Sequence, residues 1–122
     1  MRVLIANKLA SFVPGRLQDL GCDVTVDATA SGPALTARIA EIDPEVLIVR
    51  STKVKSVDIS AGRALALVIR AGAGVNTIDL AAASARGVYV ANCPGKNAIA
   101  VAELTMGHLV NCDRRLVDSA VA

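Results

Sequence analysis

Five short runs rich in β-branched residues recur along the chain, and segments of helical character separate them. The runs cover residues 2–6, 23–27, 45–50, 65–70 and 88–92. The intervening segments cover about 9–20, 33–42, 56–63 and 77–86. Strands that alternate with helices favour parallel pairing through right-handed crossovers. The alternation therefore predicts an α/β fold with a doubly wound, five-stranded parallel sheet.

Residues at the element boundaries support this division of the chain. The third and fourth runs, "EVLIVR" and "LALVIR", are almost continuously apolar, which is typical of strands covered on both faces. Pro33 stands at an expected first helical position, and Asp79 lies early in its helix. Gly21 and Gly87 follow expected helix ends. We therefore expect helices on both sides of the sheet.

Composition limits the class of protein. The chain has 122 residues, of which 53% are apolar and 2% aromatic, so we expect one domain with an aliphatic core. A net charge of +2 gives no reason to expect a nucleic acid or a membrane as partner. The three cysteines form no CxxC pair, which argues against a zinc site or a disulfide framework. The first ten residues are typical of a strand rather than a signal sequence, and we expect a cytoplasmic protein.

The segment after residue 92 differs from the rest. We expect a turn at 93–96, Asn97 as a helix N-cap, and then one helix running almost to Ala122. The chain ends without a helix-stop signal, so we expect that it has been cut from a longer protein. These features divide the chain into residues 1–97 and a long helical segment at 98–122.

Cations and glycines follow neighbouring strands. Arg50, Ser51 and Lys53 come after the third strand, and Arg70 ends the fourth. The carboxyl ends of parallel strands are where doubly wound sheets bind ligands. We therefore expect Arg50, Lys53 and Arg70 to converge on one small acid with two anionic groups, helped by backbone N–H groups of the glycine turn at 71–75.

Plainer interpretations exist for each feature alone. Basic residues at strand ends are often only solvated, and many strand-to-helix connections contain glycine. The turn is also not a dinucleotide fingerprint, because Thr77 stands where GxGxxG needs its third glycine. Asn92 likewise stands where an acidic residue would be expected. Together, however, the features favour an anion site.

Three motifs in order carry a family resemblance. The stretches "VLIVRSTKV", "VIRAGAGVNTID" and "NCPGKNAIAVAELTMGHLV" resemble the D-2-hydroxyacid dehydrogenases. The resemblance is specific from Val46 to Val110 and weak before residue 45. Asn76 departs from it, because relatives often have an acidic residue there.

The resemblance implies a flavodoxin-like substrate-binding domain at 1–97, followed by a helix that leads into an NAD-binding domain. It implies a parent enzyme that oxidises 3-phosphoglycerate with NAD at the first step of serine synthesis. Ala73 would also lie beside the nicotinamide, although we expect no cofactor on this chain alone. The implied substrate-binding residues are Arg50, Ser51, Lys53, Arg70, Gly72, Ala73, Gly74 and Val75.

We expect no catalytic residue and no metal site in this chain. The family's catalytic Arg, Glu and His follow the point where the sequence ends. His108 and Glu103 lie within the last helix, where structural roles are the better interpretation. Cys93 follows a strand end, but no general base stands near it in the sequence.

The expected cut has a structural consequence. One apolar face of the sheet should lie bare, because the segment that would complete it is missing. Helix 98–118 would then either fold back onto its own sheet or exchange with a second copy in a homodimer. The alternative function is a stand-alone or engineered α/β scaffold that binds no substrate.

Overall fold

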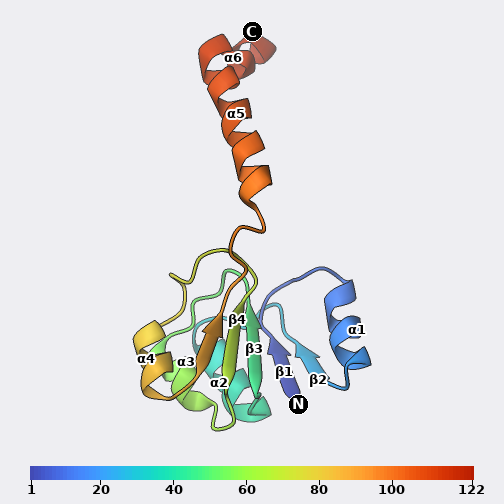
Figure 1. The fold of residues 1–122 in the computed structure, drawn as a ribbon, viewed down its shortest axis with the longest axis vertical. Helices are drawn as coiled ribbons and strands as arrows, with labels where there is room; N and C mark the ends of the chain where they lie inside the picture. Colours follow the sequence, from blue (N-terminus) through green and yellow to red (C-terminus); the bar gives the residue numbers. More distant parts are fainter.

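A computed structural model describes residues 1–122 and contains a single parallel sheet (Figure 1). The strands follow the order β2-β1-β3-β4-β5, which is the flavodoxin-like order. Every strand pair is parallel, so the predicted five-stranded α/β fold is confirmed. The strands are β1 (Arg2–Ile5), β2 (Asp23–Val26), β3 (Val46–Val49), β4 (Leu67–Arg70) and β5 (Tyr89–Ala91).

Four helices lie in the crossovers between the strands. They are α1 (Phe12–Asp19), α2 (Pro33–Ile42), α3 (Ser56–Ala61) and α4 (Leu80–Ala85). Gly21 and Gly87 follow helix ends with φ of 82° and 67°, as their positions in the sequence indicate. Asp79 is the N-cap of α4, and its carboxylate accepts a hydrogen bond from the amide of Ala82. The predicted start of this helix at residue 77 is wrong, because Ile78 pairs with Val54 in an isolated β-bridge.

The core is divided unequally between the two faces of the sheet. Helices α2, α3 and α4 cover one face (Figure 1), where fourteen buried residues form a single cluster. On the other face only four residues are buried, and α1 supplies the packing. The larger cluster is entirely aliphatic, as the composition predicts.

The sheet face opposite α4 is partly bare over β4 and β5. Leu67 and Ile69 on this face are only half-buried, and Tyr89, paired with Leu67, is 77% exposed. No helix packs over these side chains, because α1 lies at the β2 side of the sheet. The face that we expected to lie bare is therefore uncovered over β4 and β5, but α1 covers it at the β2 side.

The carboxyl-terminal segment extends away from the sheet (Figure 1). Helix α5 (Ala98–Arg114) contacts no other element except α6 (Leu116–Val121). The predicted single helix over 98–118 is wrong, because Arg115 adopts a left-handed conformation with φ of 46° and separates two helices. Folding back onto the chain's own sheet is not observed. Neither helix is both long and apolar enough to cross a bilayer.

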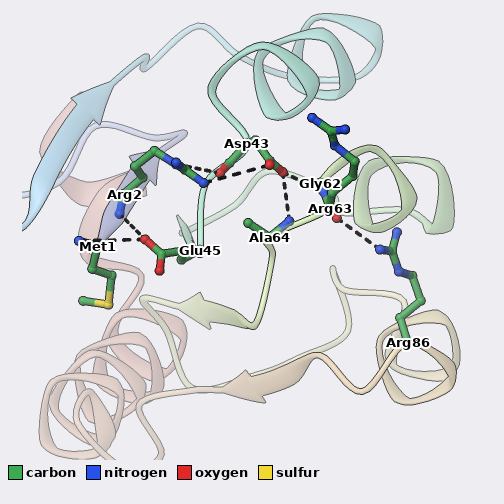
Figure 2. Close-up of polar contacts among 8 residues, drawn as sticks. All are labelled: Met1, Arg2, Asp43, Glu45, Gly62, Arg63, Ala64 and Arg86. Atoms are coloured by element: carbon green, nitrogen blue, oxygen red, sulfur yellow. Dashed lines mark hydrogen bonds and ion pairs between the residues drawn. The ribbon is translucent and has the colours of Figure 1, made fainter.

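A cluster of polar contacts lies at the amino-terminal ends of the strands (Figure 2). Asp43 follows α2 with φ of 47°, and its Oδ1 accepts hydrogen bonds from the amides of Arg63 and Ala64 at 2.7 and 2.9 Å. The amide of Arg2 donates to Glu45 on the neighbouring chain segment at 2.7 Å. The bonds of Asp43 join the end of α2 to the loop before β4, at the end of the sheet opposite the carboxyl ends of the strands.

Candidate functional site

The turn at residues 71–75 leaves the carboxyl end of β4, at the edge where parallel sheets bind ligands. The amide of Ala71 donates to the carbonyl of Val49 at 2.7 Å and continues the pairing of β3 with β4. The amide of Gly72 then donates to the carbonyl of Arg70 at 2.8 Å, which reverses the chain sharply. The turn is thus attached directly to the central strands.

Each of the next three carbonyl groups in the turn accepts a hydrogen bond from another group. The amide of Cys93 donates to Gly72 O at 2.9 Å, and Nδ2 of Asn92 donates to Ala73 O at 2.6 Å. Nη1 of Arg70 donates to Gly74 O at 2.8 Å. The acceptors of the turn are therefore already used within the protein.

Most amide groups of the same turn, in contrast, make no hydrogen bond within the protein. The N–H groups of Ala73, Gly74 and Val75 donate to no acceptor in the protein. Consecutive unpaired amides form a concavity of positive partial charge that suits a carboxylate or phosphate oxygen. The amides of residues 73–75 can consequently donate hydrogen bonds to a bound anion.

The side chain of Arg70 fixes the shape of this turn by hydrogen bonds to backbone carbonyls. Its Nε donates to the carbonyl of Arg50 at 3.0 Å, while Nη1 holds Gly74. A Cβ atom on Gly72 would lie 3.2 Å from the guanidinium carbon, and one on Gly74 would lie 3.0 Å from Nη1. The two glycines are explained by this close approach, since neither has a positive φ. Arg70 is in the first place a positioning residue for the turn.

A cavity of about 570 Å³ opens over the turn. Its lining includes three cationic side chains and no carboxylate, and none of the three cations forms an ion pair within the protein. The electrostatic character of the cavity is therefore positive. The lining residues are Arg50, Arg70, Ala71, Gly72, Ala73, Gly74, Cys93, Lys96 and Asn97.

The sequence-predicted residues do not all meet in this cavity. Ser51 and Lys53 line a separate cavity of about 960 Å³ that also borders α2 and α3. Val75 lines neither of these two cavities, although its amide belongs to the unpaired set. Arg50 and Arg70 thus line one cavity and Lys53 lines the other, so the structure does not bring the three cations together in one cavity. The loop after β3 turns Lys53 toward the groove beside α2.

Three residues outside the predicted substrate-binding set also shape the site. Asn7, just after β1, accepts from the amide of Arg50 at 2.7 Å and so holds the loop after β3. Asn92 secures the glycine turn from the end of β5. Lys96 brings a third cation from the turn before α5. All three residues follow the carboxyl end of a strand, and this placement is the sequence signal that points to them.

The described residues do not form a dinucleotide site of the usual kind. Such a site needs a helix that begins directly after the glycine turn, so that its N-terminus meets the pyrophosphate. Here α4 begins only at Leu80. His108 and Glu103 lie on α5, outside the cavity, and no group of three or more metal-binding side chains occurs. The arrangement can bind an anion, but it supplies no histidine or carboxylate for proton transfer.

Comparison with known proteins identifies the family. The family model described as "D-isomer specific 2-hydroxyacid dehydrogenase, catalytic domain" matches residues 3–119. The chain belongs to this family. D-3-phosphoglycerate dehydrogenase of Sus scrofa is 41% identical over 122 residues, which are 99% of this chain and 22% of that protein.

Two crystal structures of similar proteins show the same fold. The TT0316 protein of Thermus thermophilus matches 99% of this chain with a TM-score of 0.87 and 29% identity. The NAD⁺-bound 3-phosphoglycerate dehydrogenase of Entamoeba histolytica matches 91% with a TM-score of 0.79 and 29% identity. This chain covers 39% and 38% of those two chains, respectively. It therefore corresponds to one part of each of these two proteins.

Proposed function

We propose that this chain is the substrate-binding part of an NAD-dependent D-3-phosphoglycerate dehydrogenase, the enzyme that oxidises 3-phosphoglycerate to 3-phosphohydroxypyruvate in L-serine synthesis. The observation that carries the proposal is the turn at 71–75, with three unpaired amides at a cavity lined by cations and no carboxylates. The 41% identity to the Sus scrofa enzyme gives the substrate class.

The two anionic groups of the substrate have different partners in this proposal. The carboxylate accepts from the amides of residues 73–75, because a planar group with several lone pairs suits consecutive N–H donors. The phosphate lies toward Arg50, whose guanidinium is exposed and makes no hydrogen bond within the protein. A guanidinium binds two phosphate oxygens side by side, which fixes orientation as well as charge.

The proposal assigns binding and orientation to these residues, and no chemical step. Bound NAD supplies the hydride acceptor in such an enzyme. By the family resemblance, Ala73 also faces the nicotinamide end of that cofactor, so the turn would hold the substrate beside it. A proton acceptor must lie within hydrogen-bond reach of the substrate hydroxyl, and no histidine or carboxylate of the cavity lining can serve. The parent enzyme would supply that group from outside the described cavity.

The first test is a titration of the 122-residue chain with 3-phosphoglycerate, followed through backbone amide resonances. We expect shifts concentrated at residues 70–75 and at Arg50. Lys53 and its neighbours in the other cavity should stay unchanged, which makes them an internal control. An absence of shifts at millimolar ligand would contradict the proposal and favour the alternative, a scaffold that binds no substrate.

Association of two copies forms the second part of the proposal. Helix α5 exposes apolar side chains along its whole length, including Ile99 at 77% and Leu104 at 62%. Surfaces of this kind favour association, and an exchanged α5 could cover the bare face of the partner's sheet. Sedimentation velocity over a hundredfold range of concentration should show a dimer. A monomer throughout would contradict this part alone.

A further inference from the structure

Lys96 is, with Arg50, one of two cations of the cavity whose side chains make no hydrogen bond or ion pair within the protein. Arg70, in contrast, donates hydrogen bonds from Nε and Nη1 to backbone carbonyls. The ammonium of Lys96 makes no hydrogen bond and no ion pair within the protein. Lys96 is exposed, and no carboxylate lines the cavity to neutralise it. The ammonium of Lys96 is therefore free to pair with an anionic ligand in the cavity.

The position of Lys96 over the turn is fixed by neighbouring bonds. Asn92 and Cys93, at the end of β5, both donate to carbonyls of the glycine turn, at 2.6 and 2.9 Å. Gly95 then takes a φ of 72° and the amide of Ala98 closes the turn onto it at 3.2 Å. This short, tied segment keeps Lys96 at the cavity even though α5 extends away. Three cations thus reach the cavity from the ends of three adjacent strands.

We propose that Lys96 is a specificity residue that binds the phosphate of the substrate together with Arg50 and selects a phosphorylated acid over an acid with a carboxylate alone. This inference rests on the proposed function of the cavity. The carboxylate needs no lysine, because the amides of residues 73–75 already provide its donors. A flexible ammonium suits a phosphate, whose oxygens present charge in several directions.

The test compares two ligands on four forms of the chain. The ligands are 3-phosphoglycerate and D-glycerate, which differ only in the phosphate. The forms are the unchanged chain, Lys96→Met, Lys96→Arg and Lys8→Met. Lys8 is exposed after β1 and lines neither cavity, so its variant matches the change in net charge.

We expect Lys96→Met to weaken binding of 3-phosphoglycerate about fivefold, the factor typical of losing one exposed charge pair. Binding of D-glycerate should not change, Lys96→Arg should retain most of the affinity, and Lys8→Met should match the unchanged chain. Equal affinity of Lys96→Met and the unchanged chain for 3-phosphoglycerate would overturn the inference while leaving the proposed function intact. An equal loss for both ligands would also overturn it. Failure of the unchanged chain to bind 3-phosphoglycerate would instead overturn the proposed function, and this inference with it.

Discussion

Replacing Arg70 with methionine should disorder the anion-binding turn without unfolding the domain. The change removes two hydrogen bonds to backbone carbonyls, Nε to Arg50 O at 3.0 Å and Nη1 to Gly74 O at 2.8 Å. Each bond contributes about 0.5–1.5 kcal/mol when well buried, and these two are partly solvated. A loss of about 1 kcal/mol in the free energy of unfolding is therefore expected, equivalent to a fall of about 4 °C in Tm for a domain of this size.

The matched control is Arg50→Met. The side chain of Arg50 makes no hydrogen bond within the protein, and an exposed replacement of this kind changes stability by less than about 0.5 kcal/mol. The two variants therefore separate two roles. Arg50→Met should weaken anion binding while leaving the free turn unchanged, whereas Arg70→Met should alter the turn before any ligand is added.

The assay combines thermal unfolding with amide resonances of the ligand-free chain. In Arg70→Met, the resonances of Gly72 to Val75 should move, and hydrogen exchange should accelerate at the amides of Gly72 and Cys93, which are hydrogen-bonded in the intact turn. If those resonances coincide with the unchanged chain and Tm does not fall, Arg70 does not hold the turn. The closeness of its guanidinium to the two glycines would then need another explanation.

Two further predictions concern the stability of the fold. Gly62→Ala should lower the free energy of unfolding by about 1–3 kcal/mol, because the added Cβ would lie 3.0 Å from buried atoms of Ile39 and Leu65. Urea unfolding measures this loss. The control is Gly15→Ala, which should not destabilise the domain because no atom lies within 4 Å of the added Cβ. Hydrogen bonds from the backbone amides of the loop before β4 hold the pKa of Asp43 below its ordinary value of 3.8. The charged form is thus favoured by folding, and its stabilisation is present above pH 3.8 and lost as the pH falls further. Asp43→Asn should flatten that part of the acid-unfolding curve, and an unchanged curve would refute the assignment.

The fold was predictable from the sequence because its signals are local. Continuous apolar runs marked the buried strands, and Pro33 and Gly87 marked helix ends that the structure reproduces. Boundaries were less accurate where tertiary pairing decided them. Residues 77–79 were predicted as the start of a helix, but Ile78 pairs with Val54 across the loop. Such a bridge between distant segments leaves no periodic pattern in either one.

The candidate site was predictable only in part. Sheet topology places Arg50 and the glycine turn at one edge, and that could be inferred from the order of the strands. The direction that a loop takes after its strand could not be inferred from the strand order. Lys53 therefore lines a different cavity, and Lys96 lines the cavity over the turn instead. The break at Arg115 was equally hidden, because a single left-handed arginine inside a helical pattern has no sequence signal.

The use of main-chain donors in the glycine turn has a consequence for mutagenesis. The proposed recognition groups are backbone amides, and two of the residues that form the turn, Ala71 and Ala73, are already alanine. An alanine scan would therefore leave these amides in place and report on the side chains around them, such as Arg50, Arg70 and Asn92. Replacing single amides by esters, one at a time through residues 73–75, removes the donor and keeps the side chain. Only such backbone editing can weigh the contribution of each recognition group directly.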